Sequence, residues 1–143
     1  MSILIGLGLF IVNILVKVLI INTLVPINPA KWKESRLWFA WIFQPVSDEV
    51  IRYVALIIST TCGIIFTWLN VTLEQVAYIL FRQRLGKVEL LLTIGVGLIQ
   101  WVCLALMIYF GNLVGFIFAV GFRILWCSVV YDVCLSENTD KEA

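Results

Sequence analysis

The chain has 143 residues, of which 62% are hydrophobic and only 13% are charged, and its mean hydropathy is +1.06. Ordinary soluble domains carry about 25% charged residues, so this composition indicates a protein that resides in lipid. Ten Lys and Arg against nine Asp and Glu give a net charge of +1. Such a balance lacks the basic field that nucleic-acid-binding proteins carry, and we expect no nucleic-acid partner.

The residue types that most enzyme and metal sites need are missing or isolated. The chain has no histidine and four cysteines, none of them in a CxxC pair. Cys/His zinc sites and Ser-His or Cys-His nucleophile pairs both need an imidazole. We therefore expect no catalytic residues, no metal site and no cofactor. The scattered cysteines also predict no disulfide framework.

The first predicted membrane span covers residues 3–25, because crossing a bilayer takes about 20 predominantly apolar residues. Pro26 and Pro29 end it, and no cleavage site follows, so we interpret it as a retained helix rather than a signal peptide. Its apolar sequence is interrupted at four positions, Asn13, Lys17, Asn22 and Thr23.

The segment 31–44 contains three tryptophans, Trp32, Trp38 and Trp41, close to Lys31, Lys33 and Arg36. Tryptophan next to basic residues is favoured in the headgroup region of a bilayer. The apolar run within the segment is too short to span. We expect a short helix lying in the interface, and the alternative is a loop packed over the bundle.

Three further spans are predicted. The second begins after a capping Ser47 or Asp48 and covers 51–73, with a continuation to 81 as an alternative. The third covers 89–110 and the fourth 113–133, and the two residues between them predict a tight antiparallel hairpin. Residues 135–143 form a polar tail. The expected fold is all-α: one membrane domain over 1–143, with four transmembrane helices in a bundle and one interfacial helix.

Each predicted span carries one stripe of small or polar residues at helical spacing. In lipid, small residues let helices approach closely, and polar residues face the interior of a bundle. The sequence therefore predicts a four-helix bundle with a polar interior. The stripes comprise Gly6, Asn13 and Lys17; Ser59, Gly63, Thr67, Asn70 and Glu74; Thr93, Gly97 and Gln100; and the helix-packing residues Gly111, Gly115 and Ala119 in line with Arg123 and Cys127.

Arg123 is the central candidate, because an arginine at mid-bilayer costs about 2.5–3.5 kcal/mol on insertion scales and normally faces protein, water or a ligand. Its acidic candidate partners are Glu74 and Asp132, both nearer the span ends. Three interpretations stay open: a bundle-locking ion pair with Glu74 or hydrogen bonds to carbonyls, Asn13 and Gln100; a site for an anionic headgroup or small anion; and a pair with an acidic residue on a partner subunit. Lys17 either has a buried role or extends along its flexible stem to the interface.

Orientation follows weakly from charge. The two sides of a four-span protein would carry four Lys and Arg each, so the positive-inside rule does not discriminate. The loop around Arg82, Arg84 and Lys87 holds no acid, whereas the first loop holds three. We therefore expect both termini in the cytosol, and no compartment is indicated.

Three function classes follow from these features. The leading hypothesis is a non-enzymatic accessory or scaffolding subunit of a membrane complex, with membrane lipids and other transmembrane subunits, or a second copy, as partners. The alternative is a small oligomeric channel or transporter with an anion-favouring interior around Lys17 and Arg123. A lipid-modifying enzyme would have to use Glu74 with Arg82 and Arg84 and ranks third.

Overall fold

The computed structural model of this chain describes residues 1–24, 43–81 and 87–142, and helices account for nearly all of them. No strand occurs within these ranges, so the all-α prediction is confirmed. The helices are α1 (Ser2–Leu24), α3 (Gln44–Ile58), α4 (Thr60–Phe81), α5 (Lys87–Phe110) and α6 (Asn112–Glu142). The predicted interfacial segment, with Trp32, Trp38 and Trp41, lies outside the described residues apart from its last two positions, 43 and 44.

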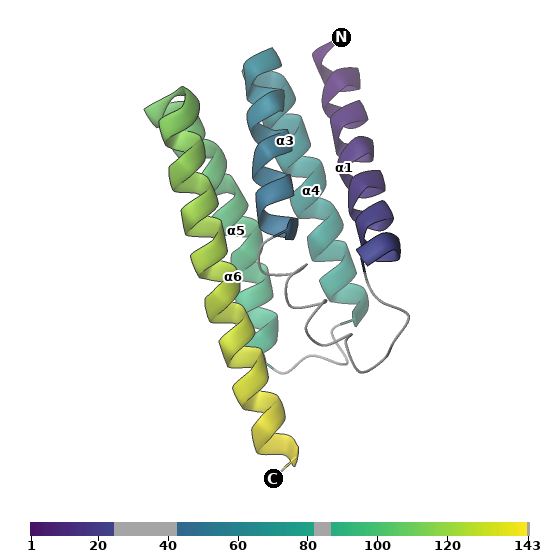
Figure 1. The fold of residues 1–143 in the computed structure, drawn as a ribbon, viewed down its shortest axis with the longest axis vertical. Coiled ribbons are helices and arrows are strands. Elements are labelled where there is room, and N and C mark those ends of the chain that lie inside the picture. The colour runs from purple at the N-terminus through teal and green to yellow at the C-terminus, as the bar shows by residue number, and fades with distance from the viewer. Residues whose placement is uncertain (25–42, 82–86, 143) are drawn as a thin grey trace.

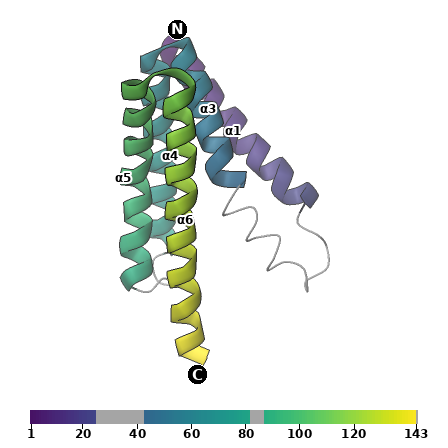
Figure 2. The ribbon, with the colours of Figure 1, turned by 60° about the vertical axis from the view of Figure 1, so that its left-hand side comes forward.

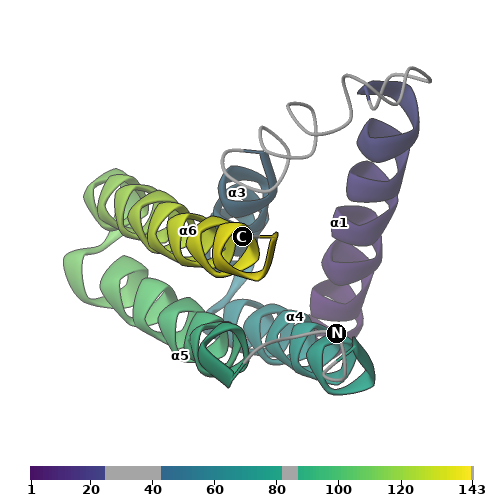
Figure 3. The same ribbon diagram turned by 90° about the horizontal axis from the view of Figure 1, so that it is seen from below.

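Two antiparallel hairpins organise the bundle. Helices α3 and α4 pack against each other, as do α5 and α6, and α3 also contacts α6 (Figures 1 and 3). The α5–α6 turn consists of Gly111 alone, with φ of +65°. That left-handed conformation is favourable only for glycine among common residues, which explains how two long helices reverse over one residue.

The second predicted span is wrong as a single helix. The chain stops being helical at Ser59, whose φ of −168° and ψ of 153° are extended, and α3 and α4 lie on either side of it. The Ser59 hydroxyl accepts a hydrogen bond from the Cys62 backbone N–H at 3.1 Å. A serine that caps a helix in this way satisfies one of its free N–H groups, so one residue inside an apolar run can end one helix and start the next.

Because α3 and α4 form an additional hairpin, the two termini lie at opposite ends of the bundle. The N-terminus lies at the same end of the bundle as the α3–α4 turn and the α5–α6 turn, whereas the C-terminal end of α6 lies at the opposite end (Figure 1). The expectation that both termini share a side assumed a single helix between residues 51 and 73, and it does not fit this arrangement.

Helix α1 lies at the edge of the bundle. It packs against α4 and α3, and it tilts away from the other helices along its length (Figures 2 and 3). Gly6 makes the closest approach, because a Cβ atom there would lie 3.1 Å from Ile65 Cγ2 and 3.3 Å from the Cys62 carbonyl oxygen. Along residues 2–20 of α1, about half of the residues are exposed.

The distribution of polar and apolar side chains is the reverse of that in a soluble bundle. Among the described residues, eight polar or charged residues are buried, while each described helix has large apolar side chains that are exposed. Within the described residues, one helix is long and apolar enough by length and composition to cross a membrane, α1 over Ser2–Ile20. Shorter apolar stretches cover Ile94–Phe110 of α5 and Leu113–Val129 of α6.

Candidate functional site: a buried network of charged side chains

The candidate site is a network of hydrogen-bonded and ion-paired side chains contributed by all five helices, which we call the polar core. Eight of its members are buried, and the other two, Lys17 and Glu74, have side chains that are 15% and 11% exposed. The polar core consists of Asn13 and Lys17 of α1, Asp48, Glu49 and Arg52 of α3, Thr67, Asn70 and Glu74 of α4, Gln100 of α5 and Arg123 of α6.

Helix α3 supplies three of the charges because its buried face is polar. Its buried positions recur at intervals of three and four residues, which places them on one side of an α-helix. Pro45 stands in the first helical turn, where its missing N–H removes no intrahelical bond. The exposed face of the same helix is apolar, so α3 is amphipathic with its polar side inward. The buried positions are Pro45, Asp48, Glu49, Arg52 and Ala55.

Asp48 connects α1 to α3. Its Oδ1 atom accepts hydrogen bonds from Lys17 Nζ at 2.5 Å and from Asn13 Nδ2 at 2.7 Å. Its Oδ2 atom lies 3.6 Å from Arg123 Nη2 and has no hydrogen-bond partner. The carboxylate is fully buried, and these two cations compensate the cost of removing it from water.

Arg52 connects α3 to α4 and α5. Its guanidinium pairs with Glu49 one turn earlier on the same helix. It also donates from Nε to Thr67 Oγ1 at 2.9 Å and from Nη2 to Gln100 Oε1 at 2.7 Å. The planar, multiply donating guanidinium suits such a fixed set of acceptors, and Arg52 is fully buried.

Gln100 is the point where these contacts converge. Its Oε1 atom accepts from both Arg52 and Asn70, the latter at 2.9 Å, and its Nε2 atom donates to Glu74 Oε2 at 2.6 Å. The amide therefore uses its acceptor twice and one donor once. It holds the interior faces of α3, α4 and α5 in one arrangement.

Arg123 lies between two carboxylates without a short bond to either. Its Nη2 atom is 3.5 Å from Glu74 Oε1 and 3.6 Å from Asp48 Oδ2. Its Nη1 atom donates to the Val96 carbonyl at 3.4 Å, and its Nε atom has no partner. The Arg123 contacts therefore combine a pair with Glu74 and a bond to a carbonyl. Arg123 also contacts Asp48, which is a candidate helix cap in the sequence.

The formal charges of the polar core cancel. Three cations, Lys17, Arg52 and Arg123, face three carboxylates, Asp48, Glu49 and Glu74. A balanced interior has no net attraction for an anion, although Lys17 and Arg123 alone would suggest one. Among the described residues, no group of three His, Cys, Asp or Glu side chains could hold a metal ion.

Gly115 and Ala119 of α6 lie on its interface with α5. A Cβ atom at Gly115 would lie 2.6 Å from the Leu106 carbonyl oxygen and 2.7 Å from Met107 Cα. Ala119 is buried, and its carbonyl accepts a weak hydrogen bond from Cys103 Sγ at 3.6 Å. Gly111 forms the turn itself. These contacts let α6 approach closely enough to place Arg123 in the polar core.

Sequence reasoning missed Asp48, Glu49 and Arg52. In the sequence, Asp48 is a candidate helix cap beside Ser47, Glu49 is an acidic residue of the first loop, and Arg52 lies at the start of a predicted span. The available signal was the spacing of charges: Asp48 and Glu49 stand four and three residues before Arg52, which puts all three on neighbouring positions of one helical face. In the structure, this face of α3 points into the bundle.

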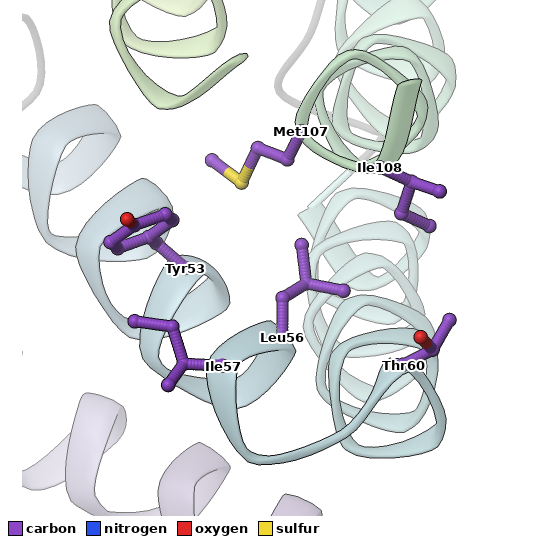
Figure 4. Close-up of a pocket in the computed structure, with 6 residues that line it drawn as sticks. All are labelled: Tyr53, Leu56, Ile57, Thr60, Met107 and Ile108. Carbon is purple, nitrogen blue, oxygen red and sulfur yellow. The ribbon is translucent and has the colours of Figure 1, made fainter. Parts of the chain in front are cut away.

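One cavity lies apart from the polar core. It has a volume of about 200 Å³, and Figure 4 shows it between the last turn of α3, the start of α4 and the end of α5. No charged side chain lines it. Its lining residues are Tyr53, Leu56, Ile57, Thr60, Met107 and Ile108.

Comparisons with protein-family models, with curated proteins and with solved structures find no match to this chain.

Proposed function

We propose that the chain is a small polytopic membrane protein in which α1, α4, α5 and α6 cross the bilayer, and in which the shorter α3 is inserted among them and returns the chain to the side of the N-terminus. The observation that carries this proposal is the inverted distribution of side chains, with charges inside and large apolar residues outside. In water this arrangement would bury four charges fully and two partly, and would expose the apolar surface, each at a cost. In lipid the same arrangement is favourable.

The lengths of the helices support this assignment. The four long helices have 22 to 31 residues, which at ~1.5 Å per residue reaches the ~30 Å of a bilayer core. Helix α3 has 15 residues and extends about 22 Å, less than a full crossing. Short helices at membrane depth are tolerated where protein surrounds them, and α3 contacts α1, α4, α5 and α6.

Within the membrane we propose a non-enzymatic role as an accessory or scaffolding subunit of a complex. The salt bridges of the polar core link α1, α3, α4 and α6 to one another. Such internal pairing supports a locking role for the charges rather than a reactive one. Catalysis would need a reactive group beside a base in a site that substrate can enter.

Helix α1 is the surface that we propose for binding a partner helix. Its exposed side carries five residues at alternating intervals of four and three, the repeat by which helices pack in coiled coils and membrane bundles. Gly8 lies in this stripe, and a Cβ atom there would meet nothing within 4 Å. A neighbouring helix could therefore approach closely at that point. The stripe consists of Leu4, Gly8, Ile11, Leu15 and Val18.

Purification from native membranes tests this role. A tagged chain extracted in mild detergent is expected to elute with a stoichiometric partner or a second copy. Gly8→Leu is expected to reduce that association, whereas Gly121→Leu, at another glycine with nothing within 4 Å of a Cβ, is the matched control on α6. A monomeric chain without a partner, or equal loss with both variants, would contradict the proposed surface.

The alternative function is a small oligomeric channel or transporter. An anion path around Lys17 and Arg123 is less well supported, because three carboxylates face the three cations. Reconstitution of the pure protein decides the point, since an anion-conducting assembly must release chloride from loaded vesicles. Vesicles that stay impermeable at high protein density would remove this alternative.

A further inference from the structure

The two carboxylates on either side of Arg123, those of Asp48 and Glu74, have different partners. Asp48 Oδ1 accepts hydrogen bonds from Lys17 at 2.5 Å and from Asn13 at 2.7 Å, while the donor to Glu74 Oε2 among the described residues is the neutral amide of Gln100 at 2.6 Å. The cation that the structure pairs with Glu74 is Arg123, at 3.5 Å. Glu49 is in direct contact with Arg52. Of the three carboxylates, Glu74 therefore has the weakest cationic support.

A second asymmetry concerns exposure at the surface of the bundle. The side chains of Asp48 and Glu49 are fully buried, whereas that of Glu74 is 11% exposed. Glu74 is therefore the carboxylate of the polar core that a proton can reach from the edge of the bundle without displacing another ion pair. The other partly exposed member of the polar core is Lys17, whose ammonium group pairs with Asp48.

Two of the five buried side-chain atoms without a hydrogen-bond partner in the described part of the chain lie where Arg123 approaches Asp48. Asp48 Oδ2 and Arg123 Nε are buried and have no hydrogen-bond partner. Buried polar atoms without partners are uncommon, and they point to a bound water or to a contact made in another state. Only 3.6 Å separates Arg123 Nη2 from the free Asp48 oxygen, so a small movement of the guanidinium would complete that bond.

We propose that Glu74 is a proton-binding site within the bundle, and that Arg123 shifts from Glu74 towards Asp48 when the proton binds. The proton is taken from water onto Glu74 Oε1, the oxygen that faces Arg123. Gln100 keeps its hydrogen bond to Oε2, and the guanidinium stays protonated throughout. The polar core then changes from a formal charge of zero to +1, and Arg123 pairs with Asp48 in place of Glu74.

Charged groups on three other helices act on Glu74, namely Arg123 of α6, Asp48 and Arg52 of α3, and Lys17 of α1. Arg123 is the one of these in contact with the Glu74 carboxylate. A proton on Glu74 leaves Arg123 with one carboxylate instead of two. Since Asp48 already has an unbonded oxygen beside Arg123, the guanidinium keeps a negative partner and is not stranded in the interior.

Infrared difference spectroscopy of the purified full chain between neutral and acidic pH tests the proton site. Wild type is expected to gain a carboxylic-acid C=O band that Glu74→Gln lacks and Glu49→Gln retains. If Glu74→Gln does not fold, Glu74→Asp takes its place, because a shorter acid farther from Gln100 and Arg123 is expected to titrate at a different midpoint pH. A band that survives Glu74→Gln, or an unchanged midpoint in Glu74→Asp, overturns the proposal.

Nitrogen-15 NMR spectroscopy tests the movement of Arg123 separately. In protein labelled with nitrogen-15 at arginine, the Arg123 side-chain resonances are assigned by their loss in Arg123→Lys. They are expected to move with pH in wild type and to occupy the acidic position at every pH in Glu74→Gln. Arg123 resonances that are the same in wild type and Glu74→Gln at neutral pH would overturn the shift. This result does not depend on the partner-binding role, which is measured by copurification.

Discussion

Lys17 of α1 and Asp48 of α3 form an ion pair with an Nζ–Oδ1 distance of 2.5 Å, in which the carboxylate is fully buried and the ammonium side chain is 15% exposed. Asn13 donates to the same oxygen from one turn earlier on α1. The remaining contacts of α1 with the bundle include the close approach at Gly6 and the bond from Cys62 Sγ to the Ser2 carbonyl. Asp48 is therefore the polar anchor of a helix that otherwise presents apolar side chains.

A double-mutant cycle at this anchor is expected to show strong coupling. Asp48→Asn removes the charge that two cations share, and breaking a buried ion pair costs about 3–5 kcal/mol. Lys17→Met is expected to cost less, because Arg123 and Asn13 still support Asp48. Chemical unfolding in detergent, followed by circular dichroism, gives the coupling, which is about 0.5–3 kcal/mol for residues in one network. Strictly additive effects would show that the pair contributes nothing.

A matched pair of glycine substitutions tests the α5–α6 interface. Gly115→Ala places a Cβ atom 2.6 Å from a backbone oxygen of Leu106, so the helices must separate and stability is expected to fall. Gly121→Ala meets nothing within 4 Å, and replacing a mid-helix glycine with alanine is expected to raise stability by about 0.5–1 kcal/mol. Thermal unfolding of the two variants in the same detergent gives the comparison. Equal effects would rule out the close packing at Gly115.

Substitution of Gln100 is expected to lower the stability of the bundle more than substitution of its neighbour Asn70. Gln100→Leu leaves Arg52, Asn70 and Glu74 each without one hydrogen bond, and each unsatisfied buried group costs about 1–3 kcal/mol. Asn70→Leu removes one of those bonds. The free energy of unfolding is therefore expected to fall by a larger amount in Gln100→Leu, and the opposite order would contradict the convergence of contacts on Gln100.

The sequence predicts the buried position of some residues of the site and not of others. Asn13, Gln100 and Arg123 are polar residues inside long apolar runs, and their inward placement follows from the cost of exposing them to lipid. Asp48 and Glu49 follow Pro45 and Ser47, which is also the pattern of a helix start. Local sequence does not distinguish a cap from a buried polar face.

The break between α3 and α4 at Ser59 is likewise not predictable from the local sequence. Serine is tolerated inside membrane helices, where its hydroxyl bonds to the preceding turn, so the run around Ser59 predicts one continuous helix. The reversal depends on contacts made elsewhere, because the short α3 can only be retained where Asp48, Glu49 and Arg52 find partners on α1, α4, α5 and α6. Those partners are up to 75 positions away from Asp48 in sequence.

The sidedness of the termini tests the whole arrangement. In the proposed bundle, Ser2 and Thr60 lie at one end and the C-terminal end of α6 lies at the other (Figure 1). Single cysteines at Ser2, Thr60 and Ala143 are introduced into a variant without the four native cysteines. In sealed vesicles of one orientation, a membrane-impermeant maleimide is expected to label Ser2→Cys and Thr60→Cys from one side and Ala143→Cys from the other. Detergent then exposes all three sites and gives the total. Labelling of Ser2→Cys and Ala143→Cys from the same side would restore the four-span topology with a single helix across Ser59, and would remove α3 as an inserted helix.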